Sequence, residues 1–178
     1  MRVISGQLGG RQLHEPKGHR THPMSEKIRG ALFNILGDTG GLTVLDAFAG
    51  SGALAIEAVS RGAKNAVAIE RDRLAQAALV QNVQELGLAS QIKAIKASAG
   101  GWSDNNPNKK FDIVLLDPPF DDLQPNLLHK IAKRHAKTGG VVVLSKKPSA
   151  EFQLMPTNYE LLAVKTYGDA QLVFYKPV

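Results

Sequence analysis

Residues 43–60 read TVLDAFAGSGALAIEAVS and combine three local signals in one short segment. The apolar run over 43–48 predicts a buried strand, and Gly50 and Gly52 predict a tight loop after it. The apolar residues that follow predict a helix over Ala53–Ser60. Because a strand that leads directly into a helix is the building unit of parallel sheets, this segment favours an α/β fold.

The same alternation continues along the chain. We expect an amphipathic helix before this segment, ended by Gly37, and a later helix capped by Asp72. The expected elements are helices over 24–36, 74–86 and 124–137 and strands over 66–70, 92–97, 111–116 and 141–144. Strands that alternate with helices predict a doubly wound, mostly parallel sheet with helices on both faces.

Glycine-containing links predict a hairpin near each end of the chain. Strands over 3–5 and 11–14 flank three glycines, which suits a small N-terminal β-hairpin. Strands over 161–166 and 171–175 are joined by Tyr167-Gly168-Asp169-Ala170, so they pair as a C-terminal antiparallel hairpin. We therefore divide the chain into a basic hairpin extension over 1–22 and one α/β domain over 23–178.

The composition indicates a globular intracellular protein. The chain has 178 residues, of which 43% are hydrophobic and 21% charged, and it contains no cysteine. The lack of cysteine excludes a disulfide framework, thiolate zinc sites and thiol catalysis. No apolar run approaches the ~18 residues that a membrane span needs. We therefore expect a cytoplasmic, monomeric protein with no membrane contact.

Positive charge is concentrated near the N-terminus. The 22 Lys and Arg against 16 Asp and Glu give a net charge of +6, and residues 1–30 carry +4 of it. Lys and Arg contacts to phosphate supply most sequence-independent affinity for nucleic acid, so a polyanionic partner is one interpretation. A solvated basic tail is the other interpretation, and charge alone leaves both open.

A carboxylate follows the glycine loop at a distance typical of adenosine binding. Glu70 ends the next expected strand, 18 residues beyond Gly52 (70 − 52), where it can accept hydrogen bonds from both hydroxyls of a ribose. In open α/β sheets, ligands bind outside the carboxyl ends of the strands. The two features together indicate an adenosine-bearing ligand.

Two cofactor classes share these features. The segment Gly50-Ser51-Gly52-Ala53-Leu54-Ala55 satisfies the dinucleotide fingerprint with alanine in its third position, but the chain lacks a second domain for a substrate. Asp46 begins the loop, and an acid there favours a ligand that carries ammonium and sulfonium charges. S-adenosylmethionine has that structure, and we expect it as the cofactor, with no metal ion.

A third strand end carries the sequence Asp117-Pro118-Pro119-Phe120. The carboxylate and the rigid carbonyl of Pro118 can accept both hydrogens of an –NH₂ group. Two acceptors outside the plane of a nucleobase favour a pyramidal nitrogen, whose lone pair is then free to attack a methyl group. Phe120 can stack on the base. This motif predicts methyl transfer to an exocyclic amine.

These motifs resemble those of a known family. The segments Asp46–Leu54, Glu70 and Asp117–Phe120 are similar to class I S-adenosylmethionine-dependent methyltransferases that modify amines. The opening segments 2–6, 10–13 and 22–36 resemble the bacterial family that methylates N2 of a guanine in 16S ribosomal RNA. Tyr167-Gly168-Asp169 is similar to the closing hairpin of that family.

The resemblance implies a Rossmann-like fold with a seven-stranded sheet and, as partner, ribosomal RNA or the assembling small ribosomal subunit. It assigns catalysis to Asp117, Pro118, Pro119 and Phe120. It assigns the cofactor to Asp46, Ala47, Phe48, Gly50, Gly52, Glu70, Arg71 and Ser98. It assigns the RNA to Arg2, Arg11, Lys17, Arg20 and His22.

The chain departs from the family pattern in two regions. His22-Pro23-Met24 stands where Arg-Pro-Thr is usual, and Gly30 replaces a common glutamate. After the third strand the family commonly has Asp or Asn to meet the adenine amine, and here Ser98 or main-chain atoms take that place. Trp102, four residues later, is a candidate for covering the adenine and equally for a core or rim aromatic.

Two other functions stay open at this point. An adenine-N6 methylase of DNA or RNA has a similar Asp-Pro-Pro-Phe motif, although the chain lacks an obvious target-recognition domain for DNA. A non-catalytic RNA-binding protein could retain the fold, although its intact Asp117–Phe120 motif argues against that reading. The five histidines show no recognised metal spacing, and we expect them on the surface.

Overall fold

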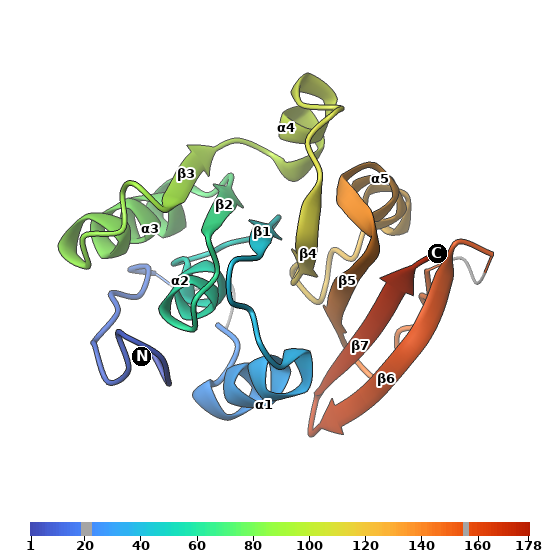
Figure 1. The fold of residues 1–178 in the computed structure, drawn as a ribbon, viewed down its shortest axis with the longest axis horizontal. Coiled ribbons are helices and arrows are strands. Elements are labelled where there is room, and N and C mark those ends of the chain that lie inside the picture. The colour runs from blue at the N-terminus through green and yellow to red at the C-terminus, as the bar shows by residue number, and fades with distance from the viewer. Residues whose placement is uncertain (19–22, 155–156) are drawn as a thin grey trace.

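The computed structural model describes residues 1–18, 23–154 and 157–178, and its sheet lies between two layers of helices (Figure 1). The helices are α1 (Glu26–Leu36), α2 (Ala53–Ser60), α3 (Arg73–Glu85), α4 (Ala99–Asn105) and α5 (Pro125–His135). The strands are β1 (Thr43–Asp46), β2 (Asn65–Glu70), β3 (Ile92–Lys96), β4 (Phe111–Leu116), β5 (Ala136–Lys146), β6 (Tyr159–Tyr167) and β7 (Ala170–Pro177).

The seven strands form one sheet in the order β3-β2-β1-β4-β5-β7-β6. The first five are parallel, while β7 pairs antiparallel with both β5 and β6. The strand order reverses between β1 and β4, which is where open α/β sheets bind ligands. The expected Rossmann-like, mostly parallel sheet with a C-terminal antiparallel hairpin is therefore confirmed.

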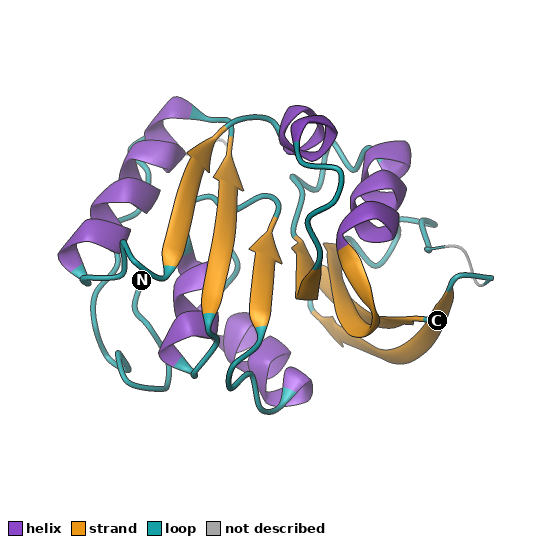
Figure 2. Ribbon diagram, turned by 45° about the horizontal axis from the view of Figure 1, so that its top comes forward, coloured by secondary structure: helices purple, strands orange, loops and turns teal. Residues whose placement is uncertain are grey.

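The helices cover both faces of the sheet (Figure 2). One hydrophobic cluster joins α1, α2 and α3 to alternate strand residues such as Val44, Ile113 and Leu115. The other joins α4 and α5 to the intervening residues, such as Leu45 and Val114. This alternation is expected because successive side chains of a strand point to opposite faces. Within the described residues, no helix is long and apolar enough to cross a bilayer.

Several element boundaries differ from the sequence expectation. β5 begins at Ala136 instead of 141, because Ala136 pairs with Phe111 of β4 before a bulge shifts the register. This early pairing also ends α5 at His135. The short helix α4 was not expected from its glycines, and Ser98 caps it by accepting a hydrogen bond from the backbone N–H of Gly101.

The expected N-terminal β-hairpin is reduced to a single antiparallel bridge between Arg2 and Gln12. Next to the bridge, the N–H of Val3 still donates to the carbonyl of Arg11 at 2.9 Å, and the N–H of Gly10 donates to the carbonyl of Val3 at 2.8 Å. The pairing stops there because the residues after Val3 bond to α2. The backbone N–H groups of Ile4 and Ser5 donate to the Glu57 carboxylate at 2.8 and 3.0 Å, and that of Gln7 donates to the carbonyl of Ser60 at 2.8 Å. A ladder therefore cannot extend through these residues.

Glu57 is fully buried and connects the N-terminal segment to two helices. Its carboxylate lies 2.7 Å from Nε of Arg61 and 3.7 Å from Nε of Arg29, which is itself fully buried in α1. The guanidinium of Arg29 also donates to the carbonyl of Arg2. A buried charge is tolerated only when it is paired and hydrogen-bonded, so each of these groups depends on the others.

Glu57→Ala should lower the free energy of unfolding by about 3–5 kcal/mol, because it leaves Arg29 buried without its counterion. Urea denaturation would measure the loss. Glu26→Ala is the matched control, since Glu26 forms an exposed ion pair with Arg2 at 3.1 Å and should hardly move the midpoint. Equal midpoints for the two variants would contradict a central role for Glu57.

Candidate active site

Three carboxylates meet at the carboxyl edge of the sheet. β2, β1 and β4 are parallel neighbours, β1 ends at Asp46 and β2 ends at Glu70. Asp117 follows the last residue of β4. Parallel strands end at the same edge, so the topology itself brings these three side chains together.

The loop between β1 and α2 requires its two glycines. Gly50 and Gly52 have φ angles of 56° and 86°, which side chains rarely adopt. A Cβ atom on Gly52 would also lie 2.4 Å from Cδ1 of Leu79 in α3. Glu70 Oε2 accepts a hydrogen bond from the N–H of Gly50 at 2.8 Å, so Glu70 and the loop support one another.

Asp46 is fully buried, and its two carboxylate oxygens have no hydrogen-bond partner among the described residues. Burial, with repulsion from the carboxylates of Asp117 and Glu70, raises the pKa of Asp46 to about 8. The nearby N–H groups of Ala55 and Phe48 offset only part of this effect. An unpaired buried acid beside two other acids is a site that a positively charged ligand would stabilise.

The Asp-Pro-Pro-Phe motif lies at the same edge. Asp117, Pro119 and Phe120 are partly exposed, and Pro118 is buried. Burial raises the pKa of Asp117 to about 6, although a hydrogen bond from Ser145 lowers it in part. The carboxylate is therefore ionised at neutral pH and able to accept hydrogen bonds.

Sequence reasoning missed Ser145. It follows Leu144 of β5, which pairs in parallel with Leu116 of β4, so Ser145 and Asp117 are neighbours one position further along. Ser145 is buried. The signal that could have found it is the register of two adjacent parallel strands, which a single sequence does not reveal.

The other expected cofactor residues differ in their surroundings. Ala47 is buried and Phe48 packs against the α4–α5 cluster. Ser98 is exposed, and its hydroxyl caps α4. Arg71 is exposed and pairs with Asp122 at 3.6 Å. Trp102 is buried against Phe111 and His135, so it is a core aromatic.

The expected RNA residues lie in or near the N-terminal segment. Arg2, Arg11 and Lys17 are exposed, and Arg2 pairs with Glu26. Arg20 and His22 lie outside the described residues.

Asn82 of α3 joins the N-terminal segment to the glycine loop. Its side chain accepts from the N–H of His14 at 2.7 Å and donates to the carbonyls of His14 and Ser51 at 3.0 and 2.9 Å. Asn82 is buried, so these bonds are shielded from water. The N-terminal segment is thus connected directly to the loop after β1.

The expectation that the histidines lie on the surface is wrong for His135. It is fully buried, with Nδ1 2.7 Å from the carbonyl of Lys109 and Nε2 2.8 Å from Oγ of Ser103. Burial lowers the pKa of His135 and favours the neutral ring. The described residues contain no group of three side chains suited to a metal ion.

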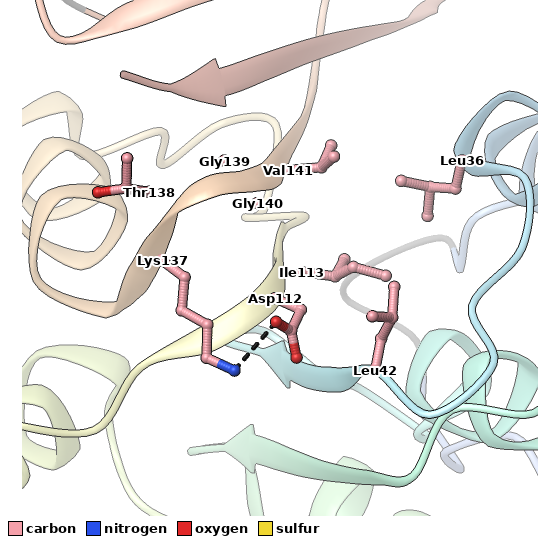
Figure 3. Close-up of a pocket in the computed structure, with 9 residues that line it drawn as sticks. All are labelled: Leu36, Leu42, Asp112, Ile113, Lys137, Thr138, Gly139, Gly140 and Val141. Carbon is pink, nitrogen blue, oxygen red and sulfur yellow. Dashed lines mark hydrogen bonds and ion pairs between the residues drawn. The ribbon is translucent and has the colours of Figure 1, made fainter.

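A separate hollow lies at the opposite, amino-terminal edge of the sheet (Figure 3). It is shallow and lined partly by the apolar side chains Leu36, Leu42 and Val141. Its charged pair, Lys137 and Asp112, is already joined at 2.9 Å. Asp112 also accepts from the backbone and hydroxyl of Thr43, so this hollow presents no unpaired charge.

Asp46→Asn should make the protein without cofactor more stable at pH 8. Between about pH 4 and pH 8 the folded protein keeps a proton on Asp46 that the unfolded chain releases, so the free energy of unfolding falls as pH rises. The variant lacks this loss, and we expect it to gain roughly 1–4 kcal/mol at pH 8. The gain should shrink towards pH 4.

Urea denaturation across this pH range would measure the difference. Asp169→Asn, in the exposed turn between β6 and β7, is the control and should follow the parent protein. If Asp46→Asn also followed the parent at every pH, Asp46 would not be an unpaired buried acid.

The chain matches the family described as "Conserved hypothetical protein 95" over residues 1–176. Ribosomal RNA small subunit methyltransferase D of Haemophilus influenzae is 29% identical over 180 residues, which cover 99% of this chain and 93% of that protein. The Escherichia coli protein of the same name is 36% identical over 121 residues, covering 67% of this chain and 60% of that protein.

The fold comparison agrees. A solved structure described as "Putative methyltransferase yhhF from Escherichia coli" matches with a TM-score of 0.88 at 29% identity, covering 99% of this chain and 97% of that one. Its sheet and helices correspond over nearly the whole chain. The protein therefore belongs to the Conserved hypothetical protein 95 family, within the class I methyltransferases.

Proposed function

We propose that this protein transfers a methyl group from S-adenosylmethionine to the exocyclic N2 amine of a guanine in 16S ribosomal RNA. The observation that carries the proposal is the unpaired, buried carboxylate of Asp46 beside the Asp-Pro-Pro-Phe motif. The Asp46 carboxylate suits a cationic cofactor, and the Asp-Pro-Pro-Phe motif suits an amine substrate. Relatives named as small-subunit ribosomal RNA methyltransferases support the substrate class.

The residues at the β1 and β2 ends fit this cofactor. A bound cation would lower the raised pKa of Asp46, and the ionised carboxylate would then offer negative charge to ammonium and sulfonium groups. Glu70 accepts N–H groups from Gly50 and Asp72, one on each oxygen, and each oxygen keeps capacity for a ribose hydroxyl. When bound, S-adenosylmethionine supplies an electrophilic methyl group on its sulfonium.

Asp117 and the carbonyl of Pro118 would accept the two hydrogens of the target amine. Held in this way, the nitrogen would become pyramidal, and its lone pair would be free to attack a methyl group. Transfer would form the N–C bond as the C–S bond broke, and the electron pair of the C–S bond would stay on sulfur. The positively charged amine then loses one proton to water, so no side chain is needed as a base.

A direct test is transfer of a labelled methyl group to unmodified 16S ribosomal RNA, with mapping of the modified nucleotide. Label on N2 of a guanine would support the proposal. Label on N6 of an adenine would favour the other amine methylases instead. A protein that binds RNA and cofactor without any transfer would be a non-catalytic relative.

Asp117→Ala should reduce the single-turnover rate of methylation by ~10²–10³, as does removal of one preorganised polar group at a reacting centre. RNA affinity should change much less, because Asp117 acts mainly in the transition state. The rate of the parent should rise with pH through about 6, where Asp117 ionises. Asp169→Ala serves as the control. A folded Asp117→Ala protein with the parental rate would exclude this site.

Joint replacement of Arg11 and Lys17 by Ala should weaken RNA binding. Both side chains are exposed in the basic segment, so each lost phosphate contact should flatten the log–log salt dependence by up to ~0.7 on single-stranded RNA. The control replaces Lys133 and Lys165, which are exposed on α5 and β6. If both double variants kept the parental slope, the basic segment would be a solvated surface.

A further inference from the structure

The loop directly after Phe120 is joined to cations on two sides. Asp121 lies 2.8 Å from Nζ of Lys147, and Asp122 lies 3.6 Å from the guanidinium of Arg71. Each cation is the first residue after a strand, since β5 ends at Lys146 and β2 ends at Glu70. Both ion pairs therefore lie at the carboxyl edge of the sheet.

The strand order places these cations on either side of the candidate active site. β2 and β5 are the outer neighbours of β1 and β4, which carry the glycine loop and Asp117. Arg71 therefore approaches from the cofactor side and Lys147 from the other side. Any RNA strand that delivers a base to Phe120 passes the loop that these two side chains contact.

The negative charge of the site makes the positions of Arg71 and Lys147 at its rim important. The centre of the site holds Asp46, Glu70 and Asp117, and its rim adds Asp121 and Asp122. Such an edge repels phosphates unless cations at the rim compensate. Arg71 and Lys147 provide that compensation, although in this structure the two rim acids occupy them.

All four side chains are open to solvent. Lys147 and Asp121 are 46% and 92% exposed, and Arg71 and Asp122 are 63% and 49% exposed. Ion pairs at such exposure contribute little to stability, because water screens them. A phosphate can therefore replace either aspartate at small cost, and it offers the cation a stronger acceptor.

We propose that Arg71 and Lys147 bind phosphates of the RNA strand on the two sides of the target nucleotide, and that Asp122 and Asp121 hold these cations until RNA arrives. This inference rests on the proposed function and names the contacts that RNA makes beside the base. The two aspartates then limit binding of RNA that brings no base into the site.

Lys147→Ala should weaken binding to a short fluorescein-labelled oligouridylate and to transcribed 16S ribosomal RNA alike. The log–log salt slope should fall by ~0.7–1, as expected for one phosphate contact. Lys137→Ala is the matched control, because Lys137 is 44% exposed and lies 2.9 Å from Asp112 at the opposite edge (Figure 3). It should keep the parental slope. Equal slopes for both variants would overturn the proposal.

Replacing Asp121 and Asp122 distinguishes competition with phosphate from simple bracing of the loop by the ion pairs. Asp121→Asn and Asp122→Asn should each tighten oligouridylate binding several-fold, because each removes a negative charge that competes with phosphate. If the pairs merely brace the loop, the same variants would weaken binding, as Lys147→Ala does, and the proposal would fail. Arg71→Ala should reproduce the Lys147→Ala slope.

The test of the phosphate contacts can fail while the proposed function holds, and the proposed function can fail while the phosphate contacts hold. Methyl transfer by the parent protein tests the reaction, while the salt slopes test the phosphate contacts. A parent that methylates guanine with unchanged slopes in Lys147→Ala and Arg71→Ala would overturn only the phosphate contacts. A parent without transfer, but with reduced slopes in those variants, would overturn only the reaction.

Discussion

The candidate active site depends on the meeting of three acids at one edge of a parallel sheet. Because β2, β1 and β4 run side by side in the same direction, Glu70, Asp46 and Asp117 share a region where their charges repel one another. Two of the three reach water or hydrogen bonds, whereas Asp46 has neither. A fold that keeps such a group gives up stability that a cationic ligand can restore, which is typical of a binding site.

The N-terminal segment is part of this arrangement although it lies outside the sheet. Glu57 binds it to α2, the helix that begins at the glycine loop, and Asn82 binds it to the carbonyl of Ser51 within that loop. Residues that carry basic side chains are therefore fixed relative to the carboxylates. Under the proposed function, this geometry holds the basic N-terminal residues at a fixed position relative to the site that would receive the cationic cofactor.

Sequence reasoning was most successful where local signals and the fold agree. The apolar runs, the cap at Asp72 and the loop glycines predict the parallel sheet and its carboxyl edge, and the structure confirms them. It failed where contacts between residues far apart in sequence determine the structure. The N–H groups of Ile4 and Ser5 bond to Glu57 of α2 instead of continuing the hairpin, and His135 is buried because Ser103 and Lys109 satisfy its ring. Glu57, Ser103 and Lys109 are all distant in sequence from the residues that they bond, so no local pattern could indicate these contacts.

The two edges of the sheet differ in how the protein compensates the charge of their aspartates. At the amino edge, the Asp112 carboxylate is paired with Lys137 and hydrogen-bonded to Thr43, and lysine and threonine hold the pKa of Asp112 below its usual range. At the carboxyl edge, burial raises the pKa of both Asp46 and Asp117 instead, and neighbouring acids raise that of Asp46 further. The same residue type is thus satisfied by the protein at one edge and left for ligands at the other. Under the proposed function, the acidic centre of a chain with a net charge of +6 would suit a cationic cofactor, and cations around the rim would suit an RNA substrate.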